Sequence, residues 1–268
     1  MGKATKIIGL SILGVFLTVG TSFADYLDYE NITIKDLYGG NGWDGGPKGV
    51  GLEDQEVSRG ATRGQNWDLE GFLQKDSELA LVGGWDFVDG FLSKKGKHYE
   101  SGDIFFDTDG NYSKENFADF EYVLDMNFDA KTYNVYDISG GYGYEKTKWG
   151  PSGVTNLVWQ YRDGGKPLYE DIDFGNSYFS GLTNEETEYE GGGKFEGGTH
   201  NAVVVDLAFL GANTEFTSYF TMTCGNDIVN GSGTAPVPEP ATMFLLGTGL
   251  LGLAGVGRKK LMGKKTEK

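Results

Sequence analysis

Residues 120–128 read FEYVLDMNF, and an apolar side chain occupies every second position from Phe120 to Phe128. A spacing of two is typical of a β-strand with one face in a core and the other in water. Residues 133–138, YNVYDI, continue the pattern after a short break at 129–131. The two segments therefore predict an antiparallel hairpin.

Other segments carry the same signal. Residues 214–223 alternate again, with Phe216, Phe220 and Met222 on one face and Tyr219 on the other. Residues 202–210 form a more continuous apolar run, as expected of a strand that is covered on both faces. No stretch keeps a helical period over three turns. Further strands are expected at 68–73, 78–87 and 103–106, with turns at 39–42, 109–111, 163–165 and 191–193.

The composition agrees with short strands joined by tight turns. The chain has 44 Gly among 268 residues, and aromatic residues make up 14%. Gly disfavours helices and aromatic residues favour strands. A single cysteine excludes an internal disulfide framework and any multi-thiolate metal site. We therefore predict an all-β fold, with one jelly-roll-like antiparallel β-sandwich over residues 25–230.

The charge is distributed unevenly along the chain. The formal net charge is −16, but residues 25–235 contain 15 Lys and Arg against 37 Asp and Glu, and so carry −22. Nucleic-acid binding needs a concentrated basic surface, so this acidity excludes it. Such a surface stays soluble and repels anionic polymers unless divalent cations bridge the two.

Residues 1–24 have the three parts of a secretory signal peptide. Lys3 and Lys6 form a basic start, residues 7–19 are apolar, and small residues precede an abruptly acidic sequence. Cleavage is expected between Ala24 and Asp25. The segment predicts export through the Sec translocon and removal by signal peptidase.

A second apolar segment lies at residues 241–256, where 16 residues carry no charge. As a helix it would be about 24 Å long, short of the ~30 Å hydrocarbon layer, so it predicts a short transmembrane helix. Arg258, Lys259 and Lys260 follow it and act as a basic stop that holds that end in the cytoplasm. The charges at both ends therefore place residues 25–235 on the other side of the membrane.

Val237-Pro238-Glu239-Pro240, the apolar segment and the basic cluster together resemble the PEP-CTERM sorting signal. In this resemblance Pro238, Glu239 and Pro240 are the sorting motif, residues 237–268 are the sorting signal, and residues 231–236 are a linker. It implies a membrane-anchored precursor recognised by an exosortase, a membrane enzyme of Gram-negative bacteria that make extracellular polysaccharide. The alternative is an ordinary C-terminal anchor with a Pro-rich hinge.

The acidic middle resembles, less specifically, PEP-CTERM surface proteins of unassigned activity. The residues that carry this resemblance are 81–87, 101–107 and 223–227. It implies an exported β-rich domain and supplies no site.

The best candidate for a metal site is a calcium loop at Asp107, Asp109 and Asn111. Oxygen ligands at alternate positions of a turning backbone can converge on a hard cation. The spacing does not fit an EF-hand, although Asp103 or Glu115 could complete a different calcium loop. The alternative is a turn in which Asp and Gly serve the backbone geometry.

Tryptophans beside acidic residues are candidates for stacking on sugars. Aromatic rings offer apolar faces, and nearby carboxylates accept hydrogen bonds from hydroxyl groups. Trp43, in a Gly-rich loop, and Trp85, beside Asp86, are the two selected positions. The alternative for each is a place in the core.

No catalytic residue is predicted. His98 and His200 are the only histidines, and neither lies in a metal-ligand or nucleophile motif, so surface or satisfied strand positions are expected for both. Cys224 is expected to be buried, with an intermolecular disulfide as the alternative. No cofactor other than calcium is expected.

These observations predict an exported, non-enzymatic protein of the cell surface or extracellular matrix that associates with extracellular polysaccharide in a biofilm. A secreted carbohydrate-active enzyme is one alternative, and it would need two carboxylates at a defined separation across a cleft. A purely structural matrix subunit is the other, and it would bind no glycan.

Overall fold

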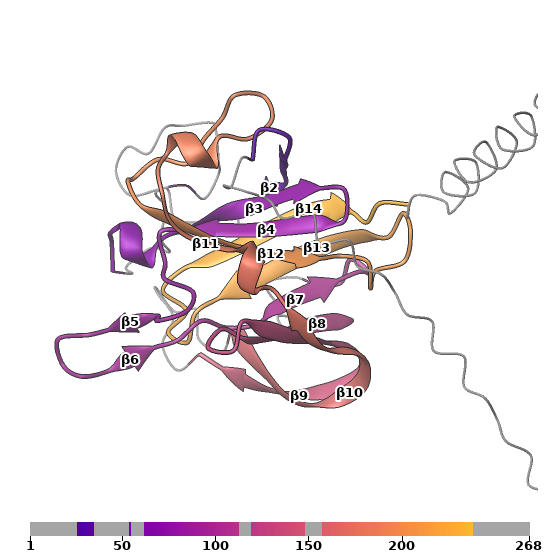
Figure 1. The fold of residues 1–268 in the computed structure, drawn as a ribbon. Helices are drawn as coiled ribbons and strands as arrows, with labels where there is room; N and C mark the ends of the chain where they lie inside the picture. Colours follow the sequence, from indigo (N-terminus) through magenta and orange to yellow (C-terminus); the bar gives the residue numbers. More distant parts are fainter. Residues whose placement is uncertain (1–25, 35–53, 55–61, 113–118, 148–156, 238–268) are drawn as a thin grey trace, which may run out of the picture.

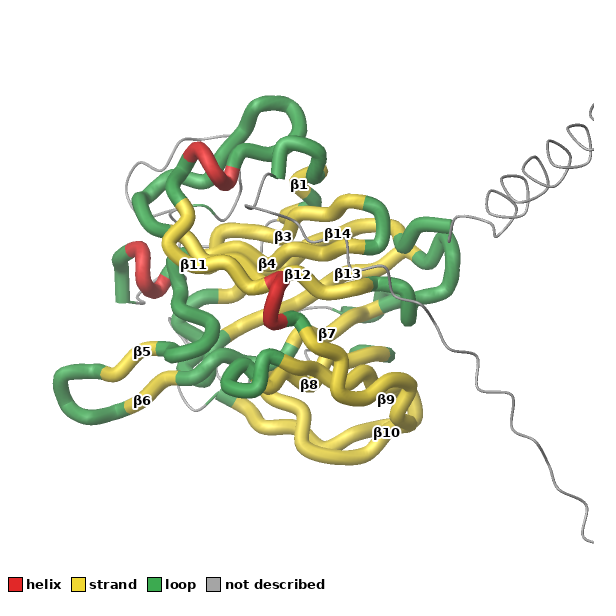
Figure 2. Tube along the Cα trace, in the orientation of Figure 1, coloured by secondary structure: helices red, strands yellow, loops and turns green. Residues whose placement is uncertain are grey.

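The computed structural model describes residues 26–34, 54, 62–112, 119–147 and 157–237. These residues form antiparallel β-sheets with three short 3₁₀ turns between them (Figures 1 and 2). The predicted all-β class is confirmed. The closer assignment to a jelly-roll-like sandwich stays a prediction.

The first sheet has five strands in the order β1-β3-β4-β12-β11. Hairpins join β3 to β4 and β11 to β12, and the pairing of β4 with β12 connects the two hairpins. Its strands are β1 (Glu30–Asn31), β3 (Leu69–Lys75), β4 (Glu78–Gly83), β11 (Tyr178–Leu182) and β12 (His200–Asp206).

The second sheet has seven strands in the order β10-β9-β8-β7-β13-β14-β2. Its strands are β2 (Thr33–Ile34), β7 (Ile104–Asp107), β8 (Tyr122–Asn127), β9 (Thr132–Lys146), β10 (Val158–Asp173), β13 (Glu215–Thr221) and β14 (Ile228–Thr234). A separate hairpin pairs β5 (Phe91–Leu92) with β6 (His98–Tyr99), and the 3₁₀ turns are η1 (Gln65–Trp67), η3 (Gly175–Ser177) and η4 (Glu185–Thr187).

One hydrophobic core lies between the two sheets. Leu81 of the first sheet and Leu124, Phe216 and Phe220 of the second belong to the same buried cluster. Two further clusters cover the outer faces of the sheets, so several strands are buried on both sides.

The predicted hairpin at 120–138 is confirmed, because β8 pairs with β9. The expectation of one wet face is wrong for the middle of β8. Leu124 packs into the shared core, while Val123 is equally buried in the outer cluster of the second sheet. Residues on the outer face of a strand are buried when another layer covers them.

The two later strands agree with their patterns. Phe216, Phe220 and Met222 pack into the shared core, and Tyr219 into the outer cluster. The run at 202–210 is covered on both faces as predicted, but the strand itself ends at Asp206.

One predicted turn is wrong. Residues 163–165 lie inside β10, which continues to Asp173. Gly164 and Gly165 have φ angles of 92° and 67°, and the register of β10 against β9 shifts on either side of them. Glycine here permits a bulge in a long strand and not a chain reversal.

The predicted linker at 231–236 is also wrong, because β14 runs to Thr234 and pairs with β13. A Cβ added to Gly231 would lie 2.7 Å from Cβ of Phe72, and one added to Gly233 would lie 2.9 Å from Cζ of Phe216. These glycines allow a close approach to neighbouring side chains. The domain therefore extends beyond residue 230, and β14 follows Cys224.

The predicted signal peptide, the sorting motif, the transmembrane helix and Trp43 lie outside the described residues. Within the described ranges, no helix is long and apolar enough to cross a membrane.

Candidate functional site

The predicted calcium loop begins where β7 ends. The Asp107 carboxylate accepts hydrogen bonds from the backbone N–H groups of Asp109 (3.2 Å), Gly110 (2.9 Å) and Asn111 (3.3 Å) through Oδ1. Its Oδ2 accepts another from Tyr112 N–H at 3.3 Å. This is the backbone role that the sequence left open as the alternative to calcium.

The structure adds Glu121 to this loop. Carboxylate oxygens of Asp107, Asp109 and Glu121 lie within 4.8 Å of one another, and we call these three residues the surface cluster. Burial, and then the charges of Asp109 and Asp107, raise the pKa of Glu121. The cluster could hold a hard cation such as calcium.

Three other predicted ligands have different places. The Asn111 amide donates to Asp109 Oδ2 at 2.9 Å. Asp103 is buried elsewhere and accepts from the backbone N–H groups of Met126 and Tyr161. Glu115 lies outside the described residues.

Trp85 does not present a face to a sugar. Its side chain is fully buried in the shared core, and its indole N–H donates to Ser101 Oγ at 2.8 Å. The correction has a simple cause, since Trp85 continues the alternation of Leu79 and Leu81, which face the shared core.

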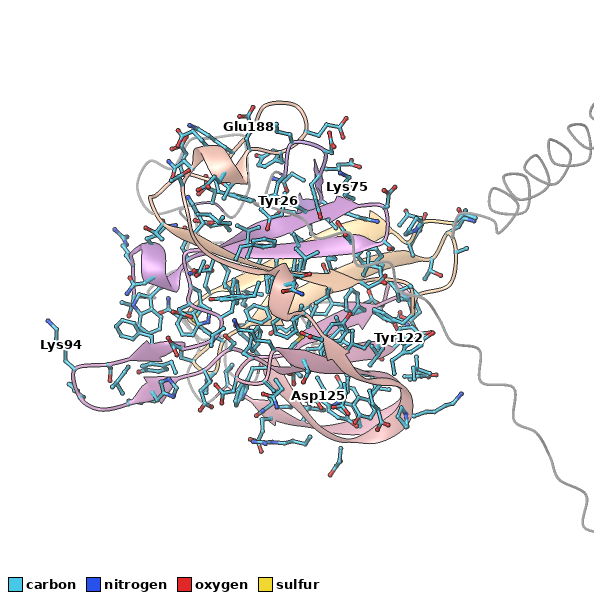
Figure 3. The ribbon with its side chains drawn as sticks, in the orientation of Figure 1. Tyr26, Lys75, Lys94, Tyr122, Asp125 and Glu188 are labelled. Carbon is cyan, nitrogen blue, oxygen red and sulfur yellow. The ribbon has the colours of Figure 1, made fainter. Side chains whose placement is uncertain are left out.

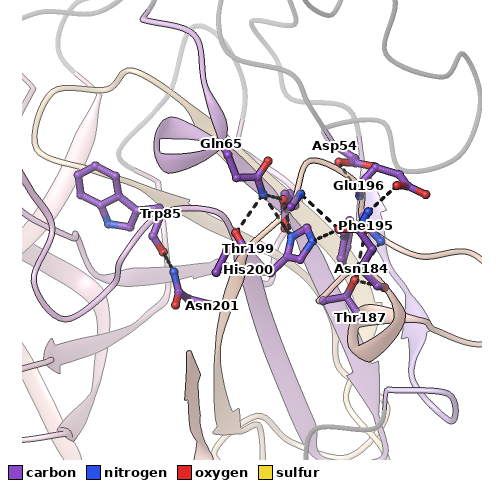
Figure 4. A network of polar contacts seen from close by, with 12 residues as sticks. Asp54, Gln65, Trp85, Asn184, Thr187, Phe195, Glu196, Thr199, His200 and Asn201 are labelled. Atoms are coloured by element: carbon purple, nitrogen blue, oxygen red, sulfur yellow. Dashed lines mark hydrogen bonds and ion pairs between the residues drawn. The ribbon is translucent and has the colours of Figure 1, made fainter. Parts of the chain in front are cut away.

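A buried polar network that was not predicted from the sequence lies on the outer face of the first sheet (Figure 4). His200 Nδ1 lies 2.8 and 2.7 Å from the two carboxylate oxygens of Glu70, and both side chains are fully buried. The Gln65 amide donates to Glu70 Oε1 and to the carbonyl of Thr199.

Asn184 fixes the tautomer of His200. Its Oδ1 accepts from Gly198 N–H at 3.2 Å, and its amide donates to Glu196 at 2.6 Å. The same Oδ1 lies 2.9 Å from His200 Nε2, so Nε2 carries a proton and donates. A proton is then shared between Nδ1 and Glu70.

Burial decides the charge of this pair. It raises the pKa of Glu70 and lowers the pKa of His200, because both charged forms lose their hydration. The pair is therefore a neutral one, in which the Glu70 carboxyl donates to Nδ1.

Asp54 adds a further acid to the network. Its carboxylate accepts from Glu196 N–H at 3.1 Å, and burial raises its pKa to about 7. Oxygens of Asp54, Asp68 and Glu70 lie within 4.8 Å of one another, and we call these three residues the buried cluster.

Glu70 on β3 reaches His200 on β12 across β4. Ala80 and Val82 of β4 share the outer face with Ala202 of β12. β4 ends at Gly83, and a Cβ added to Gly84, the next residue, would lie 2.0 Å from the backbone carbonyl oxygen of Gln65. Glycine at this position lets Gln65 approach closely, and the Gln65 amide donates to Glu70.

This network holds the covering segment 183–199 on the sheet and does not form an open site. A substrate does not reach Glu70 or His200 in this structure, since neither has exposed surface. The one sequence signal was an acid at position 70 in a segment with the apolar residues Leu69, Phe72 and Leu73.

His98 and Cys224 lie in ordinary structural positions. His98 is exposed and lies 3.6 Å from Glu100. Cys224 is half-buried against the shared core, and burial raises the pKa of its thiol to about 11. A thiol of that pKa is a poor nucleophile at neutral pH.

Three tyrosines of the second sheet, Tyr136, Tyr142 and Tyr144, are partly exposed, and Tyr161 is buried beside them. We call these four residues the tyrosine ribbon; the first three pack on the outer cluster of this sheet, and Tyr161 belongs to that cluster. Tyr136 stacks on Tyr161 with ring centroids 4.8 Å apart, and Tyr142 contacts Tyr144 at 5.2 Å. Burial, and then the charge of nearby Asp125, raise the pKa of Tyr136.

The comparisons with known proteins bear on the end of the chain. The family model of the PEP-CTERM protein-sorting motif matches residues 236–259. The chain carries a PEP-CTERM sorting motif. The match includes Pro238, Glu239, Pro240, Arg258 and Lys259, and Lys260 follows it directly. No curated protein and no solved structure matches the chain.

The PEP-CTERM motif supports an exported protein that an exosortase processes. It implies a membrane-anchored precursor that is sorted to the cell surface. The motif specifies a destination, and the activity of the β-domain has to be argued from its surface.

Proposed function

We propose that this exported domain associates with extracellular polysaccharide, without catalysis, through the tyrosine ribbon. The observation that carries the proposal is the arrangement of Tyr136 and Tyr161, a partly exposed ring stacked on a buried one, with a carboxylate nearby. Sugars offer C–H faces to aromatic rings and hydroxyl groups to carboxylates.

Polar groups around the ribbon support this assignment. The Asn134 amide donates to Asp125, and Asn134 lies two positions from Tyr136 on β9, on the same face. A donor and an acceptor therefore lie beside this ring, as a surface that orients sugar hydroxyl groups requires.

The fold of the domain and the export pathway of the chain complete the proposal. Two sheets around one core support a β-sandwich of jelly-roll type, and the predicted signal peptide would direct the chain to the Sec translocon and signal peptidase. Exosortase is the expected partner at the other end, where the predicted transmembrane helix anchors the precursor. The place of action is then the cell surface or a biofilm matrix.

A glycan array probed with the full chain, with and without calcium, tests the proposal. We expect binding, and we expect Tyr136→Ala with Tyr144→Ala to weaken it about tenfold, since each aromatic contact contributes about 0.5–1.5 kcal/mol. Tyr178→Ala, a half-buried tyrosine on the other sheet, is the matched control.

The other outcomes separate the alternatives. Absence of binding in both conditions would leave the structural matrix subunit, for which Cys224-linked dimers are the further test. Release of reducing sugar from a bound glycan would contradict the non-catalytic role and favour the carbohydrate-active enzyme.

A further inference from the structure

The β5–β6 hairpin projects from the body of the domain (Figures 1 and 3). Its turn, residues 93–97, reads SKKGK. Ser93 N–H donates to the carbonyl of Lys97 at 2.8 Å, and Gly96 takes a φ of 74° that suits glycine. The turn is therefore closed by its own backbone.

Three lysines make this tip basic in a strongly acidic chain. Lys94, Lys95 and Lys97 are exposed, and the Lys94 side chain points away from the body in Figure 3. Within the described ranges, no carboxylate forms an ion pair with Lys94 or Lys95. Glu100 is the acid closest in sequence to β6, and it faces His98.

The base of the hairpin is anchored and its tip is partly apolar. Trp67 contacts the rings of Phe91 at 4.4 Å and Tyr99 at 5.3 Å between centroids. Lys97 lies over the Tyr99 ring, with Nζ 4.5 Å from the ring centroid. Leu92 is 67% exposed. The hairpin thus presents fixed cations beside apolar surface at little cost in conformational entropy.

The charge and the position of the hairpin favour an anionic polymer as its partner over a second copy of this acidic domain or an anionic membrane. Two copies of a domain with so many acids repel each other, whereas a thin polymer chain can contact the tip alone. The tip extends up to about 10 Å from Phe91, beyond the ~8 Å screening length of physiological salt. In Figure 1 the hairpin lies on the side of the domain opposite the end of β14.

We infer that the β5–β6 hairpin binds an acidic polysaccharide, with Lys94, Lys95 and Lys97 pairing with sugar carboxylates or sulfates and Leu92 contacting the sugar ring. The inference rests on the proposed polysaccharide association but assigns a second surface with its own specificity. The tyrosine ribbon takes sugar faces, and the hairpin selects for charge.

Binding of the full chain to immobilised alginate, a polyuronate, tests this, with neutral dextran and anionic phospholipid vesicles in parallel. We expect alginate binding that weakens as NaCl rises from about 0.05 to 0.5 M. Lys94→Glu with Lys95→Glu and Lys97→Glu should reduce the affinity at least about tenfold, since charge-assisted contacts are lost and like charges replace them. The corresponding Arg triple variant should retain binding and shows that the hairpin folds.

A charge-matched control carries Lys75→Glu, Lys131→Glu and Lys194→Glu, all away from the hairpin, and should bind alginate like the parent chain. Equal losses in both Glu triple variants would overturn the inference, as would stronger binding to the vesicles or salt-dependent self-association that the hairpin variant abolishes. Binding of neutral dextran alone would overturn this inference and leave the proposed function standing. Binding of no glycan at all would overturn both.

Discussion

The buried cluster and the surface cluster each hold three carboxylates with oxygens within 4.8 Å of one another, yet their surroundings differ. In the surface cluster, Asp107 accepts hydrogen bonds from backbone N–H groups two to five positions along the chain. In the buried cluster, Glu70 faces a histidine 130 positions away. The first cluster stabilises a turn, and the second joins a covering segment to a sheet.

The difference shows what burial does to the same functional group. Backbone donors favour the ionised form of Asp107, which offsets part of the burial that raises its pKa. Glu70 and Asp54 have few such donors, so burial raises the pKa of each well above its ordinary value. Protons, and not backbone amides, compensate the buried acids.

The largest effect is expected for Glu70→Ala. It leaves His200 fully buried without its carboxyl partner, and an unsatisfied buried polar group of this kind costs up to about 3 kcal/mol of the free energy of unfolding. Urea unfolding followed by tryptophan fluorescence measures the loss. Glu190→Ala, an exposed acid of the same covering segment, should change stability by less than about 0.5 kcal/mol.

Glu70→Gln sharpens this prediction. A glutamine amide can donate to His200 Nδ1 as the neutral carboxyl does, so the loss should be about 1 kcal/mol or less. A loss as large as that of Glu70→Ala would mean that the pair is ionised, and the neutral assignment would be wrong.

The next effect is a pH dependence carried by Asp54. Its pKa rises from 3.8 in an ordinary setting to about 7 in the folded chain, so the folded state holds a proton that the unfolded state releases. This bound proton adds to the free energy of unfolding. The contribution is fully present below about pH 4 and is lost as the pH rises to about 7, at up to ~1.4 kcal/mol per pH unit.

Asp54→Asn isolates this contribution, because an amide can still accept from Glu196 N–H and does not titrate. The difference in stability between the variant and the parent chain should grow in favour of the variant from pH 4 to pH 7. Urea midpoints at several pH values measure it, and a constant difference would show that Asp54 is ionised throughout.

A smaller loss, about 1 kcal/mol, is expected for Asp107→Ala in the surface cluster, comparable to the removal of a helix cap. The backbone N–H groups that it leaves can turn to water, because the loop is at the surface. Hydrogen exchange should speed up at Gly110 and Asn111 and stay unchanged at Val203 in the core. Slower exchange in the loop, or a loss as large as that of Glu70→Ala, would contradict the turn-stabilising role.

Local features of the fold were predictable from sequence and contacts between distant strands were not. The alternation of Phe216, Tyr219 and Phe220 reports directly which face of one strand is buried. From the sequence alone, Gly231 and Gly233 resemble part of a linker. Glycine is needed at these positions because side chains of other strands, Phe72 and Phe216, approach the backbone closely, and the sequence does not show these contacts.

The same limit applies to the candidate sites. Asp107 and Asp109 were predicted as neighbours because one turn places them together, whereas Glu121 joins them through the backbone pairing of Glu121 with Phe106. The Glu70–His200 pair joins β3 and β12, which both pair with β4, and only the order of strands in the sheet brings the two residues together.

The smallest effect is expected for Glu121→Gln, which removes one of the three like charges of the surface cluster. Its amide oxygen can still accept from Thr108 N–H, as Glu121 does at 2.6 Å, so the main change is less repulsion with Asp107 and Asp109. Stability at pH 7 without divalent cations should rise by about 0.5 kcal/mol or less, because partly exposed charges are well screened.

The same variant tests the predicted calcium site. If calcium binds the surface cluster, millimolar calcium makes the parent chain the more stable of the two, since the parent chain would gain thermal stability and the variant would not. Thermal unfolding of both chains in calcium and in EDTA measures this, and identical shifts would exclude the surface cluster as a calcium site.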